Sequence, residues 1–313
     1  MEPTGHDPME VLAETPGAAE LLGLAVAAEP PRGLRAEILA AATSARAPGR
    51  PAEAPEPMAP AEAFARTLDD LRTVVASVTP ADATQPAVEG WTVAGLLGHL
   101  TAIDEHFGAV LGWWPEPALL TNEHDHLAMT LDAVRTAEAV PFDEVRLRWT
   151  TVADRVTDRL ASLDGRLAER VEFHGFDFSI RSLLIARTFE AWTHGEDICR
   201  ALGRPVLVPE ESRLSLMTAA AVGALPIGML LTGREPRGRS VRIVLTGAGG
   251  GAWVQSLEPA GLAGEPDLTI VADAVEFCRV AAKRRHPAEI DVTVVGDHDL
   301  ASEVLGAAAV FAA

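Results

Sequence analysis

The residues between Pro60 and Gly203 repeat their apolar side chains at the three- and four-residue spacing of α-helices. Thr92 is suited to cap one of these helices, and Gly203 with Pro205 ends the last. Long amphipathic helices that follow one another bury their apolar faces against each other, which predicts a helical bundle. Four segments carry the pattern: residues 61–78, 91–114, 142–163 and 180–202.

One connection in this predicted bundle is much longer than the others. Residues 115–142 join the second helix to the third and include His124 and His126. Connections between bundle helices are usually two to eight residues long. We therefore expect this segment to be a crossover or a lid.

After residue 205 the pattern changes to shorter elements. Short alternating segments there predict strands, and the glycine-rich residues 247–251 predict a hairpin turn. The sequence therefore predicts a small α+β domain at the C-terminal end. Its expected helices are residues 211–231, 273–285 and 298–312, and its expected strands are residues 240–247, 251–257, 267–273 and 290–296.

Prolines separate the first part of the chain from the bundle. Residues 47–60 contain five prolines, which favour an extended spacer over a helix, and residues 31–46 before them have a helical pattern. We expect this flexible arm to lie outside the functional core. The predicted division is an N-terminal arm at residues 1–58, a bundle at residues 59–205 and the α+β domain at residues 206–313.

Charge and cysteine content narrow the classes of function. With 26 Lys and Arg against 45 Asp and Glu, the net charge is −19, which disfavours binding to a phosphate backbone. Neither a signal peptide nor an apolar run of about 18 residues is evident, so we expect no membrane partner. The two cysteines, Cys199 and Cys278, do not make a disulfide framework, and we expect both to be small buried hydrophobic residues. A cytoplasmic location is predicted.

Polar residues gather on one side of the fourth predicted helix. Glu190 and His194 are four residues apart, so both side chains point to the same face. A helical wheel adds Arg187 and Asp197 to this stripe. Four polar side chains turned toward a bundle interior are costly unless they bind each other or a ligand. On the same wheel the opposite side, with Glu196 and Arg200, is expected to face solvent.

The second helix offers a matching histidine. His99 lies among leucines on an apolar face, where it is either a hydrogen-bonded core histidine or a ligand, and His106 is a weaker candidate on the same face. Together with Glu190 and His194 it gives three N and O ligands, the number found at catalytic zinc sites. Zn²⁺ suits this set, with Fe²⁺, Ni²⁺ and Mn²⁺ as alternatives. Asp197 is expected either to orient a ligating imidazole or to pair with an arginine.

Two segments of the chain resemble the signature stretches of a known family. EGWTVAGLLGHL, residues 89–100, and LLIARTFEAWTHGEDICRALGRP, residues 183–205, are similar to the mycothiol-dependent maleylpyruvate isomerase family. Its members are DinB-like four-helix metalloproteins with a sterol-carrier-like C-terminal domain. The resemblance implies a divalent metal, usually zinc, on His99, Glu190 and His194, with mycothiol as a further ligand. It also implies an isomerase or transferase that acts on a small electrophile through a metal-bound thiolate.

A basic cluster lies in the C-terminal domain, at Arg279, Lys283, Arg284 and Arg285. It either holds a substrate carboxylate or is a solvated helix end that complements the helix dipole. Because an arginine near this helix end recurs in the resembled family, Arg284 is our candidate catalytic residue. Asp197 and Arg187 are our candidates for contact with the cofactors.

The arm keeps a second class of function open. Residues 25–46 resemble the stretch that follows the zinc module in some actinobacterial anti-sigma factors. The alternative to an enzyme is therefore a metal- or thiol-sensing regulator with a protein partner, such as a sigma factor, bound through the arm. A hydrolase that uses metal-bound water is a third possibility. The leading prediction remains an enzyme whose partners are a small-molecule substrate and a low-molecular-weight thiol.

Overall fold

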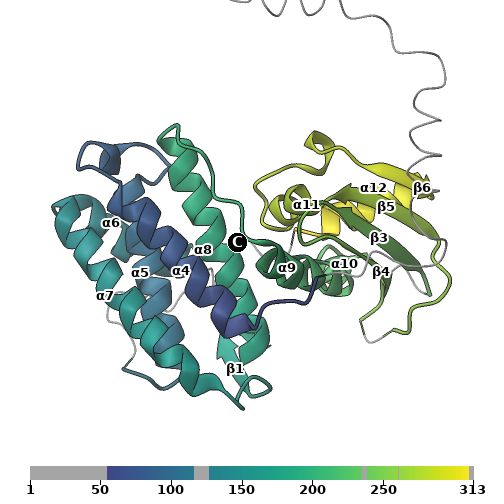
Figure 1. Ribbon diagram of the computed structural model, residues 1–313, viewed down its shortest axis with the longest axis horizontal. Helices are drawn as coiled ribbons and strands as arrows, with labels where there is room; N and C mark the ends of the chain where they lie inside the picture. The colour runs from purple at the N-terminus through teal and green to yellow at the C-terminus, as the bar shows by residue number, and fades with distance from the viewer. Residues whose placement is uncertain (1–54, 116–126, 235–237, 260, 310–313) are drawn as a thin grey trace, which may run out of the picture. The chain divides into compact units, whose positions relative to one another are not determined.

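The computed structural model describes residues 55–115, 127–234, 238–259 and 261–309 (Figure 1). These residues belong to one compact unit, residues 51–313. The predicted arm helix and most of the proline-rich spacer lie outside the described residues, and so do His124 and His126.

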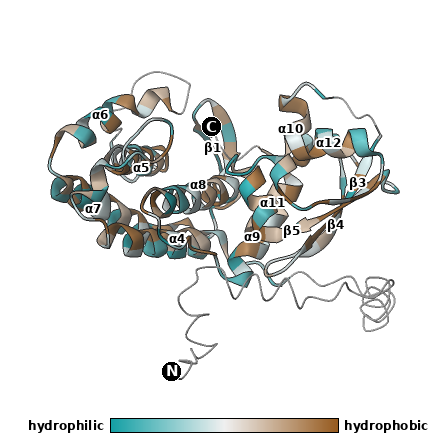
Figure 2. Cartoon of the chain, turned by 90° about the horizontal axis from the view of Figure 1, so that it is seen from above, coloured by the Kyte–Doolittle hydropathy of each residue, from teal (hydrophilic) through white to brown (hydrophobic). Residues whose placement is uncertain are grey.

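The four long helices predicted from the apolar spacing are confirmed: α4 (Pro60–Ala76), α5 (Val93–Val110), α7 (Phe142–Leu160) and α8 (Ile180–Ala201). Helix α5 is enclosed by its neighbours and buries most of its side chains (Figure 2). The hydroxyl of Thr92 caps α5 by accepting a hydrogen bond from the Gly95 amide at 3.1 Å, as predicted. The core of the bundle therefore forms around the one helix that carries His99.

Two elements of the bundle were not predicted. The connection at residues 115–142 contains a short helix, α6 (Leu131–Ala139), after a 3₁₀ turn at Ala128–Thr130. A hairpin of β1 (Arg170–Phe173) and β2 (Phe176–Ser179) precedes α8. Helix α6 is nine residues long and each strand of the hairpin is four, which is too short for a clear periodic signal.

The C-terminal part forms the predicted α+β domain. Its mixed sheet has the order β4-β3-β5-β6, in which β3 pairs with β5 in parallel and the other pairs are antiparallel. The helix predicted over residues 211–231 is in fact two helices, because the chain bends at Ala224. The elements are α9 (Glu211–Gly223), α10 (Leu225–Leu231), β3 (Ser240–Thr246), β4 (Gly251–Ser256), β5 (Leu268–Asp273), α11 (Ala274–Ala281), β6 (Thr293–Gly296) and α12 (His298–Ala307).

The sheet and its helices share one apolar core. Alternate residues of β3, Val241, Ile243 and Leu245, are buried with Phe277 of α11. Among the described residues, no single helix is long and apolar enough to cross a membrane. The bent pair α9 and α10 meets that test only by length and composition, and both helices contribute side chains to this core.

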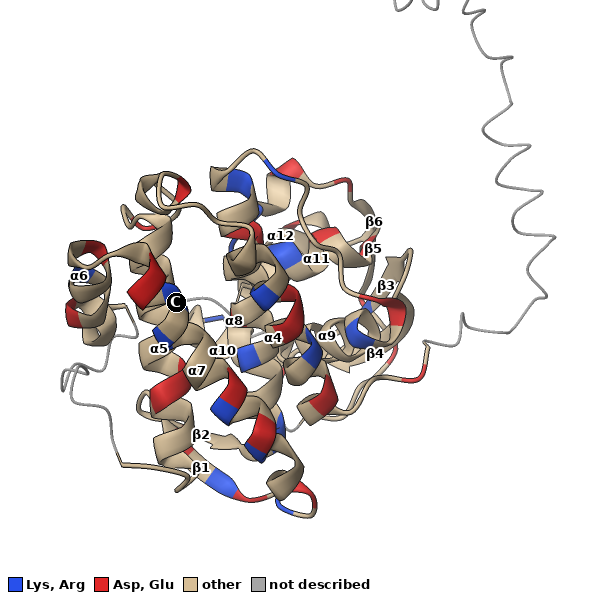
Figure 3. Cartoon of the chain, turned by 60° about the vertical axis from the view of Figure 1, so that its left-hand side comes forward, with Lys and Arg blue, Asp and Glu red and all other residues tan. Residues whose placement is uncertain are grey.

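Charged residues of both signs are interleaved along α4 and α7 (Figure 3). Arg72 of α4 illustrates the pattern, since it pairs with Asp69 on its own helix and with Asp154 of α7 at 3.0 Å. Such exposed pairs contribute little to stability individually. The bundle therefore depends on its apolar core, which is also what fixes the relative positions of α5 and α8.

Candidate metal centre

Helices α5 and α8 bring the three predicted ligands together. His99, Glu190 and His194 each offer one ligand atom, and these atoms lie within 4.8 Å of one another. His99 and His194 are buried, and the Glu190 side chain is 15% exposed. Among the described residues this is the one group of three such side chains with metal-binding spacing. The packing of α5 and α8 thus creates a largely buried set of N, O and N donors.

The hydrogen bonds of His99 determine which of its ring nitrogens faces the site. Its Nδ1 is 2.8 Å from the Thr130 hydroxyl, which in turn donates to the Leu127 carbonyl at 3.1 Å. Because the hydroxyl proton is used in that bond, its oxygen accepts from Nδ1–H. The lone pair of His99 is then on Nε2, which lies 3.2 Å from Glu190 Oε1.

His194 is oriented by a carboxylate. Its Nδ1 is 3.1 Å from Asp197 Oδ2, and an ionised carboxylate accepts hydrogen bonds without donating them. Burial raises the pKa of Asp197, but hydrogen bonds from His194 and Arg284 outweigh it and lower the pKa overall. Asp197 is therefore ionised at neutral pH, and His194 presents the lone pair of Nε2. Asp197 thus makes both of the contacts considered for it, one with the imidazole of a candidate ligand and one with an arginine.

Glu190 is held by an arginine that is fully buried. Arg187 pairs with Glu190 and donates to Asp104 Oδ1 at 2.7 Å. Burial raises the pKa of Asp104, although the Arg187 charge opposes that shift. The guanidinium is 1% exposed, and both of these contacts are with protein side chains. Arg187 thus orients Glu190, one of the three donors, from inside the protein.

The donor set fits a divalent cation. Two imidazoles and a carboxylate converge, and His99 Nε2 lies 3.2 Å from Glu190 Oε1, where the two atoms can share a hydrogen bond or a cation. Two imidazoles and one carboxylate are a ligand set of catalytic zinc sites.

The expectation that Glu196 faces solvent is wrong. Its side chain is 0% exposed and accepts hydrogen bonds from Arg279 of α11, the shortest at 2.7 Å. Arg284 donates to Asp197 through Nε and Nη2, at 2.9 and 2.8 Å. The wheel of one helix could not reveal this, because the cover comes from the C-terminal domain. Two arginines of the basic cluster thus contact α8, whereas Lys283 and Arg285 are exposed.

Other candidates from the sequence lie elsewhere. The ring of His106 stacks against Phe173 and His174 of the β1–β2 hairpin, with centroids 4.9 and 5.2 Å away, and is outside the donor group. Cys199 and Cys278 are buried as predicted, and burial raises the pKa of both thiols. Neither cysteine is therefore a thiolate nucleophile at neutral pH.

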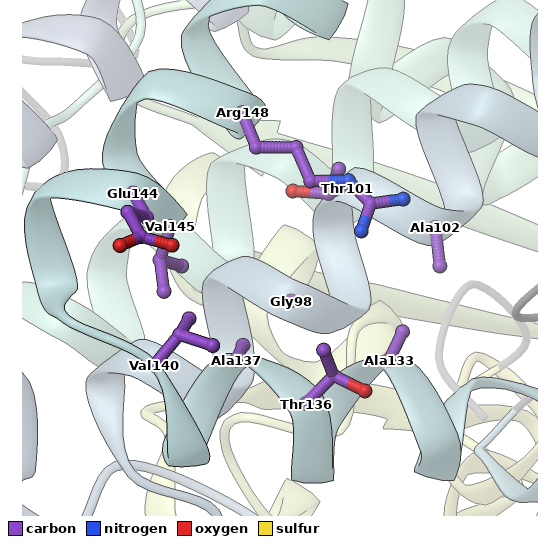
Figure 4. Close-up of a pocket in the computed structure, with 10 residues that line it drawn as sticks. All are labelled: Gly98, Thr101, Ala102, Ala133, Thr136, Ala137, Val140, Glu144, Val145 and Arg148. Carbon is purple, nitrogen blue, oxygen red and sulfur yellow. The ribbon is translucent and has the colours of Figure 1, made fainter.

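A cavity of about 350 Å³ opens on another flank of α5, between α6 and α7 (Figure 4). Small residues of α5 and α6 form its floor, and Glu144 and Arg148 of α7 stand at one wall. None of the three donors lines it. The cavity is thus separate from the metal centre.

Sequence reasoning missed three residues that support the donors. Thr130 and Asp104 orient His99 and Arg187, and the ring of Trp91 lies 5.0 Å from the ring of His99. Asp104 was visible in principle, since an aspartate within a helix that is apolar nearly all round requires a buried partner. Thr130 gave no signal, because it lies in the connection whose structure was not predicted.

The fold and the donors together define a class. Residues 63–198 match the family model of the DinB superfamily, so the helical bundle is a DinB-like domain. The fold of the described chain is that of the crystal structures of mycothiol-dependent maleylpyruvate isomerase and of a mutant of that enzyme. Each matches with a TM-score of 0.50 and 14% identity, over 75% of this chain and 91% of theirs.

Relatives are also found by sequence, in two strains of Mycobacterium tuberculosis. They are the uncharacterized protein MT0041 of strain CDC 1551 / Oshkosh and the uncharacterized protein Rv0036c of strain ATCC 25618 / H37Rv. Each is 29% identical to this chain over 240 residues, which are 73% of this chain and 86% of the relative. The similarity therefore extends over more of the chain than the bundle alone.

Proposed function

We propose that the chain is a divalent-metal enzyme that uses a low-molecular-weight thiol, mycothiol, to isomerise or to modify a small electrophile. The observation that carries this proposal is the convergence of His99, Glu190 and His194 within 4.8 Å, with three donors and no fourth from the described residues. Catalytic zinc sites keep such a position open, whereas structural sites are closed by a fourth protein ligand. The fold shared with mycothiol-dependent maleylpyruvate isomerase supports the choice of mycothiol as the thiol.

The chain's own residues prepare the donors. Thr130 and Asp197 accept from the two imidazoles, and Arg187 pairs with the Glu190 carboxylate. A bound divalent ion would act as a Lewis acid and lower the pKa of a thiol at the open position. No cysteine of the described residues can replace that thiol, because both are buried.

Arg284 receives a modified role in this proposal. Its Nε and Nη2 donate to Asp197, and its Nη1 donates to the Ala282 carbonyl at 3.2 Å. A substrate carboxylate would have to displace Asp197 to bind this guanidinium. We therefore propose that Arg284 holds Asp197 and reaches an acidic substrate only by exchanging that partner.

The first test is metal content and thiol reactivity of the full chain. We expect about one divalent ion per chain by elemental analysis, and loss of it in His99→Ala and His194→Ala. Mycothiol should bind the metal-loaded protein and react there with a maleyl-type acid or a chloro-nitroarene. The matched control is His298→Ala, since His298 is exposed on α12 and should be dispensable for the metal.

Two results would contradict the proposal in different ways. Full metal content in His194→Ala after stringent dialysis would show that the donor set is a packing coincidence. Stoichiometric metal without any thiol binding or turnover would instead favour the sensing regulator. In that case capture of a sigma factor by the full chain becomes the decisive measurement.

A further inference from the structure

The side of α8 that lies against α11 carries two neighbouring carboxylates, each bound by an arginine. Glu196 accepts from Arg279 Nη2 at 2.7 Å and from its Nε at 3.2 Å, and it also pairs with Arg200. Asp197 accepts from Arg284. A carboxylate as buried as Glu196 is costly without such partners, so its position depends on the position of Arg279.

The two arginines are held at a fixed separation by the end of α11. The Arg284 amide donates to the Arg279 carbonyl at 2.8 Å, and the Lys283 amide donates to the Val280 carbonyl at 3.0 Å. Lys283 has φ 53, in the left-handed region. These bonds form a Schellman motif, which turns the chain sharply after the helix. The turn brings both guanidiniums to consecutive residues of α8.

The consequence reaches the donors, because Glu196 and Asp197 are two and three residues after His194. We propose that Arg279 and Glu196 are positioning residues of the metal centre: their ion pair fixes the last turns of α8 against α11. Arg284 then meets Asp197, and Asp197 orients His194. This inference rests on the metal site of the proposed function. It makes the C-terminal domain a part of that site, although it contributes no donor.

Binding of the metal and contact between α8 and α11 are then thermodynamically coupled. A change that weakens the Arg279–Glu196 pair weakens binding of the metal. Bound metal in turn stabilises the contact between α8 and α11. Loss of groups that orient metal ligands typically costs about 10- to 100-fold in metal affinity. We expect a loss in this range for Arg279→Gln and for Glu196→Gln.

The test is the zinc dissociation constant of the full chain, measured by competition with a chelator. The absorption spectrum of the cobalt-substituted protein is a second readout, because its bands report ligand geometry. Both variants should bind zinc about 10- to 100-fold more weakly and show altered cobalt bands, and Arg279→Lys should recover part of the affinity. Thermal unfolding of each metal-free variant reports whether it is folded.

The matched control is Arg213→Gln. Arg213 of α9 is as buried as Arg279 and also joins the C-terminal domain to the bundle, since it donates to Asp70 Oδ2 of α4 at 2.6 Å and to the Thr67 hydroxyl. These bonds do not reach α8, so the zinc affinity of the Arg213→Gln protein should stay within about twofold of wild type. An equal loss in Arg213→Gln would overturn the proposal, because the effect would then be general domain contact.

The inference and the proposed function fail in different ways. Wild-type zinc affinity and cobalt spectra in Arg279→Gln and Glu196→Gln would overturn the inference and leave the metal enzyme intact. Conversely, a wild-type protein that binds zinc but never a thiol would overturn the enzyme and leave the inference standing. A wild-type protein that binds no zinc overturns both.

Discussion

Each imidazole of the candidate metal centre has a different kind of partner at its Nδ1. His99 donates to a neutral hydroxyl, that of Thr130, whereas His194 donates to the charged carboxylate of Asp197. A negatively charged partner raises the basicity of the ligating nitrogen more than a neutral one does. His194 is accordingly the stronger nitrogen donor, and its orientation is the one that depends on the C-terminal domain.

Away from the site, the carboxylate of Asp82 stabilises the fold to an extent that depends on pH. It accepts from the Thr79 amide at 3.0 Å and from Arg204 Nη2 at 2.9 Å. The Thr79 bonds first, and then Arg204, hold the pKa of Asp82 below its ordinary value near 3.8. Its stabilisation is therefore fully present above the ordinary pKa and is lost as pH falls through the lower folded value.

We expect Asp82→Asn to lower the free energy of unfolding at about pH 7 and to differ less from wild type at about pH 3. Denaturant titrations at the two pH values measure the difference. Asp158→Asn, on the exposed side of α7, should leave the free energy of unfolding nearly unchanged at both. A difference in the free energy of unfolding between Asp82→Asn and wild type that grew toward acid pH would contradict this prediction.

At the scale of elements, the contact between α5 and α6 depends on a glycine. A Cβ on Gly98 would lie 2.6 Å from the Ala133 carbonyl oxygen and 2.6 Å from the Ala137 Cβ. Because one of these atoms is backbone, the two helices would have to separate. Gly98→Ala should therefore destabilise the fold by about 1 to 3 kcal/mol, in spite of the better helix propensity of alanine.

Chemical denaturation compares this change with Gly306→Ala on α12. A Cβ on Gly306 meets nothing within 4 Å, so that substitution should stabilise by about 0.5 to 1 kcal/mol. Stabilisation by both substitutions would show that the contact between α5 and α6 can accommodate a Cβ at Gly98. Because Gly98 is next to His99, metal content of the variant also reports how far the loosening spreads.

Elements with a long periodic signal were predictable, and short ones were not. The four long helices and the strands of the C-terminal sheet follow the sequence pattern, whereas α6 and the β1–β2 hairpin do not extend far enough to show a period. The break at Ala224 lies between Gly223 and Pro226, and this proline in the first turn of α10 is a signal of a helix end that the predicted span 211–231 did not take into account. Helix existence was thus easier to predict than helix ends.

The same distinction applies to the site. The donors could be predicted because they lie at helical spacing within α5 and α8. Of their supports, Asp197 was predicted because it lies at helical spacing from His194, whereas Thr130 was not, because it reaches His99 from a segment distant in sequence. Glu196 shows the limit most clearly: one helix considered alone has a solvent side, and only tertiary contact with α11 buries it.

For the whole molecule, the start of the described chain matters to stability. Met58 is buried in the C-terminal core, its amide donates to the Ser212 carbonyl at 3.0 Å, and the Pro55 carbonyl accepts from the Ser215 hydroxyl at 2.6 Å. The proposed boundary at residue 58 therefore cuts through a contact with α9. We keep the arm as a separate segment and place the boundary between the arm and the folded region nearer residue 50.

A chain that starts at Pro51 should unfold cooperatively and keep its metal, because it retains these contacts. A chain that starts at Ala61 loses the Met58 side chain and should be less stable by about 2 to 5 kcal/mol, the usual cost of removing a buried methionine. Calorimetry and elemental analysis of both chains make the comparison. Loss of metal in the longer one would show that residues 1–50 take part in the core.

The burial of sulfur has a consequence for the lifetime of the protein. Both cysteines and each described methionine, Met58, Met129, Met217 and Met229, are buried. Oxidants and alkylating agents attack sulfur in proportion to its exposure and, for cysteine, its thiolate character. The described residues thus offer such reagents no exposed sulfur. A catalyst built this way would outlast the reactive compounds it handles, since chemical damage would fall on a replaceable small thiol before it fell on the polypeptide.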